Sequence, residues 1–302
     1  MSASPPSRLS VLVPFGIVTL IWGSTWIVIA GQLGSVPASW SIAYRFLIAG
    51  MVMLAIALVR RESLWLDARG WGFAVVSGAL QFTLNYSFVY EAERHVTSGL
   101  VAVVFALLLL PNALFGRIFL GHRIGPRLIL GSIVAMIGIA LLFVHEAQAS
   151  TRGTAQVLIG VGSTLAAVFF ASISNVMQAT QMSRRYPLAT LLGAAMLIGA
   201  AIDVTRAWIV DGPPVIEWSF SYIAGLLYLG VIASSVACTL YYRVIRDIGP
   251  ARAAYSSVII PVLAMLFSTV FEGYRWTWLA AAGGALTLVG LVIALSARRP
   301  AR

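Results

Sequence analysis

Uncharged polar and aromatic side chains recur at helical spacing inside the apolar stretches of this sequence. Gln81, Asn85 and Phe88 stand at positions i, i+4 and i+7, a spacing that places both amides on one face of a helix. Amide and aromatic groups bind a small solute in place of part of its water shell, without reacting with it. The chemistry indicated is therefore reversible binding of a small molecule.

Similar groups occur on several other stretches, and we predict that they line one substrate cavity. Two interpretations stay open for each residue, because membrane helices also use Ser, Thr, Asn and Gln to hold one another. For the whole set a hydrated cavity is favoured, since amides in lipid need hydrogen-bond partners. A cavity lined by aromatic residues and few charges suits a neutral or zwitterionic amphiphile. The predicted lining is Trp22, Thr25, Gln81, Asn85, Phe88, Ser172, Asn175, Tyr228, Ser235, Thr239, Tyr242, Tyr255 and Ser256.

Few ionisable groups lie within or beside these stretches. Arg45 lies about six residues, or roughly 9 Å, from the outer end of its stretch. It can reach the interface by snorkelling and pair with Glu91 or Glu93, or it can bind a carboxylate of the substrate. Glu91, Glu93 and Glu272 lie at predicted outer helix ends, where solvated loop charge is the simpler interpretation. They are also the acids to test for coupling to protons.

Two prolines interrupt apolar stretches. Pro111 and Pro261 lack an amide proton, so the carbonyls of Leu107 and Ser257 lose their helical partner. Each proline is interpreted either as a static kink or as a hinge for conformational change.

Other chemistries find no support. The histidines are dispersed near the ends of different stretches with no ligand spacing, so no metal site is predicted. No nucleophile and base pair is visible, and a sequence without lysine holds no phosphate-binding loop that ends in lysine. We expect neither an enzyme nor a cofactor.

The elements that must position these residues are ten apolar stretches. With 60% hydrophobic and 10% charged residues, the 302-residue chain is too apolar for a soluble domain. About 20 apolar residues cross a bilayer as a helix, and a lipid bilayer is thus the expected surrounding. The predicted spans are 11–31, 39–59, 71–90, 97–118, 127–145, 157–180, 188–210, 220–242, 253–272 and 276–296.

The arginines alternate from loop to loop, as a topology signal does. With the N-terminus inside, fifteen of the twenty lie on the inner side and four on the outer side, with Arg45 inside a span. This pattern favours a multi-pass protein of the plasma (inner) membrane with both termini cytoplasmic. It argues against nucleic acid as the partner of the +10 charge.

The two halves of the sequence have prolines and glycines at similar spacings. Eleven residues separate Pro111 from His122 and Pro261 from Glu272. Gly131 and Gly138 are seven apart, as are Gly283 and Gly290, and such small-residue seams predict close helix packing. The division is an N-terminal tail 1–10, a first repeat 11–146, a linker 147–153, a second repeat 154–296 and a C-terminal tail 297–302. Because five spans are odd in number, we predict an all-α membrane protein with ten transmembrane helices as two inverted five-helix repeats.

The sequence resembles the EamA family of the drug/metabolite transporter superfamily. The resemblance covers nearly the whole chain, and its residues are Trp22-Gly23-Ser24-Thr25, Arg45-Phe46, Tyr90-Glu91-Ala92-Glu93, Ser98-Gly99-Leu100, Pro111, Gly131, Gly138, Ala251-Arg252-Ala253-Ala254, Pro261, Phe271-Glu272-Gly273 and Gly290. It implies a ten-helix carrier that moves amino acids and other small metabolites, often outward, through a central cavity. His122 departs from the glutamate usual in the family, and Asn112 from an apolar residue.

The expected function is that of a secondary transporter. Its substrate is a small molecule, and we expect an exporter of amino acids or other small neutral or zwitterionic metabolites by alternating access. A channel-like facilitator or a lipid scramblase that uses the same groove is the alternative. The sequence indicates no oligomeric state.

Overall fold

The structure is a computed structural model that describes residues 8–34, 36–121, 124–149, 153–248, 253 and 256–296. Only the backbone is described for residues 8–12, 149, 247, 248, 256–258 and 295. Every regular element in these ranges is helical. The elements are α1 (Arg8–Ala30), α2 (Ala38–Val59), α3 (Ala68–Ser77), η1 (Gly78–Asn85), α4 (Tyr86–Glu93), α5 (Ser98–Phe105), η2 (Ala106–Leu108), α6 (Leu109–Leu120), α7 (Pro126–Ala149), α8 (Thr154–Gln178), α9 (Gln181–Arg184), α10 (Leu188–Val210), α11 (Phe220–Leu227), η3 (Tyr228–Val236), α12 (Ala237–Ile248), α14 (Ser256–Phe271) and α15 (Trp278–Leu295).

The helices have the length and composition of a membrane protein. Seven helical stretches in the described ranges are long and apolar enough to cross a membrane, and two further apolar ones are shorter. The seven are Val13–Ala30, Ala38–Val59, Ser98–Leu120, Pro126–Gln148, Thr154–Gln178, Leu188–Val210 and Phe220–Arg246, and the shorter ones are Ile259–Phe271 and Trp278–Ala294.

Apolar side chains cover much of the outer surface. Leu130, Ile133 and Ile137 on α7 are about half exposed, which suits a face turned to lipid. Exposed tryptophans lie near helix ends, among them Trp65 after α2 and Trp218 just before α11. Amphipathic rings at helix ends are typical of the membrane–water interface.

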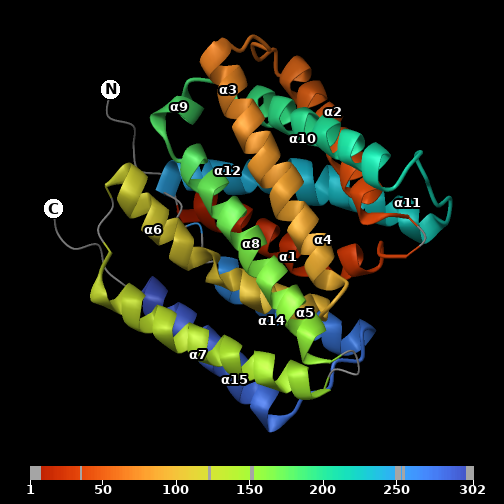
Figure 1. The fold of residues 1–302 in the computed structure, drawn as a ribbon. Helices are drawn as coiled ribbons and strands as arrows, with labels where there is room; N and C mark the ends of the chain where they lie inside the picture. The colour runs from red at the N-terminus through yellow and green to blue at the C-terminus, as the bar shows by residue number, and fades with distance from the viewer. Residues whose placement is uncertain are drawn as a thin grey trace.

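Two long helix pairs lie on opposite sides of the molecule. Figure 1 shows α7 beside α15 at the lower edge of the view and α2 beside α10 at the upper edge. A side-chain carbon added at Gly131 would lie 2.4 Å from the carbonyl of Gly290, and one at Gly138 would lie 2.6 Å from the carbonyl of Gly283. The backbones therefore meet directly, and the predicted packing role of these glycines is confirmed.

Contacts between helix ends gather at two ends of the bundle. At the first end, Tyr186 donates to Asp67, Thr190 to the carbonyl of Ser63 at 2.9 Å, and Arg127 to that of Ser296 at 3.3 Å. At the second end, hydrogen bonds join Ser39 to Asp211, Tyr44 to Val215, His95 to Gln156, Ser98 to Glu272, and His145 to Thr277. Each contact joins segments that the arginine pattern assigns to one side of the membrane.

Two of the helical stretches contain π-helical segments. η1 occupies the middle of the stretch from α3 to α4, and η3 the middle of the stretch from α11 to α12. In a π-helix each amide donates to the carbonyl five residues before it, which widens the turn and changes which residues share a face. η1 packs on α10 and η3 on α2.

Candidate functional site

A cavity lies between the first and second halves of the chain. It encloses about 800 Å³ of empty space, part of it open to solvent, and its walls come from α1, α2, η1, α4, α5, η2, α8, α12 and α14. The lining is Trp22, Thr25, Trp26, Ile29, Arg45, Gln81, Asn85, Tyr86, Val89, Ala102, Phe105, Ala106, Leu108, Ala171, Asn175, Cys238, Tyr241, Tyr242, Ile260 and Pro261.

Several residues selected from the sequence meet at this cavity. They come from α1, η1, α8 and α12, which are far apart along the chain. Arg45 and Pro261, selected for charge and for a hinge, border the same space. The residues of the predicted lining found here are Trp22, Thr25, Gln81, Asn85, Asn175 and Tyr242.

Other residues of the predicted lining lie elsewhere. Phe88 stacks on Phe170 with ring centres 5.8 Å apart, and Ser172 is fully buried outside the lining. Tyr228 shares a hydrogen bond of 2.7 Å with Ser24.

Ser235 and Thr239 face α2 and not the cavity. The Ser235 hydroxyl donates to the carbonyl of Ala49 in α2 at 3.2 Å, and the Thr239 hydroxyl lies 3.4 Å from the sulfur of Met53 in α2. Tyr255 lies outside the described residues, and of Ser256 only the backbone at the start of α14 is described.

Tyr86, Val89, Cys238 and Tyr241 border the cavity and are absent from the predicted lining. Tyr86 lies five residues after Gln81 of η1, which is the step of a π-helix. The other three follow ordinary α-helical steps: Val89 lies four residues after Asn85, Cys238 four before Tyr242, and Tyr241 three after Cys238. Small lining residues such as Ala102 and Ala171 carry no signal in the sequence.

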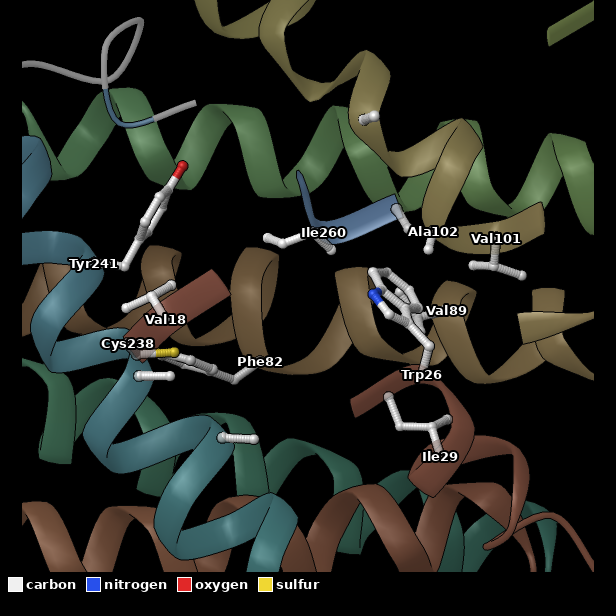
Figure 2. Close-up of a cluster of buried hydrophobic side chains, with 14 of the residues drawn as sticks. Val18, Trp26, Ile29, Phe82, Val89, Val101, Ala102, Cys238, Tyr241 and Ile260 are labelled. Atoms are coloured by element: carbon white, nitrogen blue, oxygen red, sulfur yellow. The ribbon is translucent and has the colours of Figure 1, made fainter. Parts of the chain in front are cut away.

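Aromatic rings form the wall nearest to α1. Trp22 packs edge-on against Tyr241 with ring centres 4.7 Å apart, and its Nε1 donates to the carbonyl of Ala233 at 3.1 Å. Trp26 lies 5.3 Å from the ring of Phe105. Figure 2 shows Trp26 among the apolar side chains that reach this region from α4, α5 and α14. These rings offer a large apolar surface to a bound molecule.

Arg45 is held inside the protein, not at its surface. The residue is 1% exposed; its Nε donates to Ser234 at 2.9 Å and its Nη2 to the hydroxyl of Tyr86 at 3.3 Å. Its guanidinium carbon lies 4.3 Å from the ring centre of Tyr86, a cation–π distance. The ion pairs formed among the described residues do not involve Arg45.

The predicted coupling acids lie at the second end of the bundle, in different surroundings. Glu91 is partly exposed and pairs with His95 at 2.9 Å. Glu93 is 8% exposed, and neither carboxylate oxygen has a hydrogen-bond partner in the described chain. Glu272 accepts hydrogen bonds from the amide and the hydroxyl of Ser98, at 3.3 and 2.7 Å, which ties the start of α5 to the end of α14.

The two prolines differ in their helices. Pro111 is the third residue of α6 and follows the short 3₁₀ segment η2, where the helix tightens. Pro261 lies within the continuous helix α14 and borders the cavity. Both places agree with a local change of backbone geometry.

Comparisons with known proteins point to transport. Residues 12–144 and 158–296 each match the EamA-like transporter family. Protein PagO of Salmonella typhimurium is 24% identical over 88% of this chain and 86% of its own, and an Escherichia coli protein described as the uncharacterized inner membrane transporter YedA is 29% identical over 86% and 83%. A protein of known crystal structure has a similar fold, with a TM-score of 0.70 and 22% sequence identity. The superposition covers 95% of this chain and 98% of that chain. The chain thus belongs to the EamA-like transporter family, as a multi-pass membrane protein.

Proposed function

We propose that this chain is a secondary transporter that exports amino acids or other small neutral or zwitterionic metabolites by alternating access. The observation that carries the proposal is the cavity, which takes lining residues from both segments that match the family. Aromatic and aliphatic side chains form most of its wall, three amides add polar groups, and Arg45 is its one formally charged lining residue. Such a wall suits an uncharged or zwitterionic solute.

The proposed architecture is two inverted repeats of five helices each. Exchange of the halves maps α1 onto α8, α2 onto α10, η1 onto η3, the α5–α6 helix onto α14, and α7 onto α15. Under this exchange the packed pairs α2–α10 and α7–α15 each map onto themselves. The contact of η1 with α10 maps onto that of η3 with α2, and the contact of α1 with α14 maps onto that of α8 with α5 and α6. This regularity supports the proposal, since inverted repeats are typical of secondary transporters with a central site.

The proposed topology places both termini in the cytoplasm of a cell with an inner membrane. The first end of the bundle carries the loops rich in arginine, which supports this orientation. Accessibility labelling of single cysteines in a Cys238→Ala background tests it. Residues 121–127 and 272–276 should react from opposite faces; reaction from one face would refute the inverted arrangement.

Counterflow tests the transport mechanism. Purified protein in liposomes loaded with an unlabelled amino acid should take up the labelled form faster than empty liposomes do, because a carrier returns faster when loaded. Saturable uptake that rises with internal substrate supports alternating access. Flux that neither saturates nor responds to internal substrate supports the channel alternative, and exchange of labelled phospholipid between leaflets supports a scramblase.

A further inference from the structure

The cavity wall contains one formal charge. Arg45 borders the space from α2, and the described lining residues include no Asp or Glu. A cavity with a fixed positive charge and no carboxylate attracts anionic groups and repels cations. The charge therefore bears on which solutes this site accepts.

The guanidinium of Arg45 keeps unused hydrogen-bonding capacity. Its described partners at Ser234 and Tyr86 are neutral hydroxyls, and Nη1 has no hydrogen-bond partner in the described chain. Burial of a cation is costly unless it is paired and hydrogen-bonded. A carboxylate bound beside Arg45 would supply both the counter-charge and the missing acceptor, and arginine suits carboxylate geometry well.

Two acceptor atoms lie on η1 at the same cavity. Gln81 Oε1 and Asn85 Oδ1 are buried and have no hydrogen-bond partner in the described chain. The Asn85 amide nitrogen donates to the main-chain carbonyl of Gln81 at 3.3 Å, which leaves its oxygen as the free acceptor. Neutral oxygens of this kind accept from an ammonium group without adding negative charge.

The remaining wall is apolar and aromatic. Trp26 and Phe105 pack together, and Ile29 and Val89 lie in the same lining. The cavity thus combines one cationic donor, two neutral acceptors and an apolar surface. A solute that uses all three has a carboxylate, an ammonium group and an apolar side chain.

We propose that Arg45 binds the carboxylate and that Gln81 and Asn85 bind the ammonium group of an apolar α-amino acid. The proposal rests on the proposed function and narrows it, because it requires both charged groups of the zwitterion. Organic cations are rejected by Arg45, and the corresponding acids without an amino group leave the acceptors unpaired.

The test compares substrate analogues on the wild-type protein. Counterflow is measured in liposomes with leucine and phenylalanine, with their carboxamides, with the deaminated acids, and with unrelated sugars and amines. We expect each amino acid to exchange at least tenfold faster than its carboxamide and its deaminated acid, as expected for the loss of one hydrogen bond to a charged group. Carboxamides that exchange as fast as the amino acids overturn this inference and leave the proposed carrier intact. No exchange of any compound refutes both.

Variants assign each half of the recognition. Arg45→Met should abolish the preference for the amino acid over its carboxamide, and Arg45→Lys should retain that preference at a lower rate. Asn85→Leu should abolish the preference over the deaminated acid and leave the preference over the carboxamide. These ratios do not depend on the amount of folded protein, and the Asn85 variant decides the matter if Arg45→Met does not fold.

A buried amide outside the lining provides the matched control. Asn112 in α6 is 1% exposed, and neither amide atom has a partner in the described chain. Asn112→Leu should leave both ratios unchanged. Equal changes in the Asn85 and Asn112 variants would refute a specific role for Asn85.

Discussion

The contact between α7 and α15 gives a sharp prediction about stability. A side-chain carbon at Gly290 would lie 2.3 Å from the backbone nitrogen of Ala135, and the nearest atoms are backbone, which cannot rotate away. At Gly284 of the same helix, the nearest atom would be Trp276 Cζ3 at 4.0 Å, an ordinary contact. Gly290→Ala and Gly284→Ala are therefore the same chemical change in crowded and in open surroundings.

The magnitude follows from the difference between these two variants. Each gains the same helix propensity from alanine, so that gain cancels. Gly290→Ala must in addition push the helices apart by about 1 Å, and overpacking of this kind costs about 1–3 kcal/mol. We expect Gly290→Ala to lower the free energy of unfolding by that amount relative to Gly284→Ala.

The assay is titration of purified protein in mixed micelles with sodium dodecyl sulfate, followed by circular dichroism, with thermal unfolding as a second measure. Counterflow of the surviving folded protein should stay close to wild type, because neither glycine borders the cavity. Equal stability of the two variants would show that α7 and α15 do not meet at this seam.

Two further predictions use residues at other places. Cys238 is the single cysteine of the sequence, is 2% exposed and borders the cavity. A membrane-permeant maleimide should therefore label Cys238 slowly, and amino acids that exchange should lower the labelling rate further. Mass spectrometry measures both rates. Labelling at the rate of a free thiol, or labelling indifferent to those amino acids, would contradict the cavity assignment. Asp67 accepts hydrogen bonds from Tyr186 and from the amide of Gly70, which lower the pKa of Asp67. Its contribution should be present above the unfolded pKa of about 3.9 and be lost as the pH falls through the lower folded value; thermal unfolding of wild type and Asp67→Ala should thus converge in acid, and a constant difference would refute it.

Much of the fold follows from the sequence because its causes are local. Apolar length predicts where helices run, and the glycine spacing of residues 131, 138, 283 and 290 predicts that two helices meet closely. The π-segments η1 and η3 lie inside predicted apolar stretches, and hydropathy does not distinguish a π-helix from an α-helix.

The cavity was only partly predictable, for a physical reason. Gln81 and Asn85 could be chosen because amides in an apolar stretch are unusual, whereas Ala102 and Ala171 resemble any packed residue. The depth of Arg45 was also open. Distance along the helix allowed it to reach the surface, but contacts from Ser234 and Tyr86, far away in sequence, hold it inside.

The paired π-segments also have a mechanical consequence. A π-helical turn contains one residue more than an α-helical turn. Conversion of such a turn to α-helix would therefore rotate the following helix about its own axis while the backbone stays hydrogen-bonded. Because η1 leads into α4 and η3 into α12, this rotation would change how far Tyr86 and Tyr241 extend into the cavity. Spin-label distances from α4 and α12 to α7 should then take two values in the presence of an exchanging amino acid, and a single unchanging value would rule this rotation out.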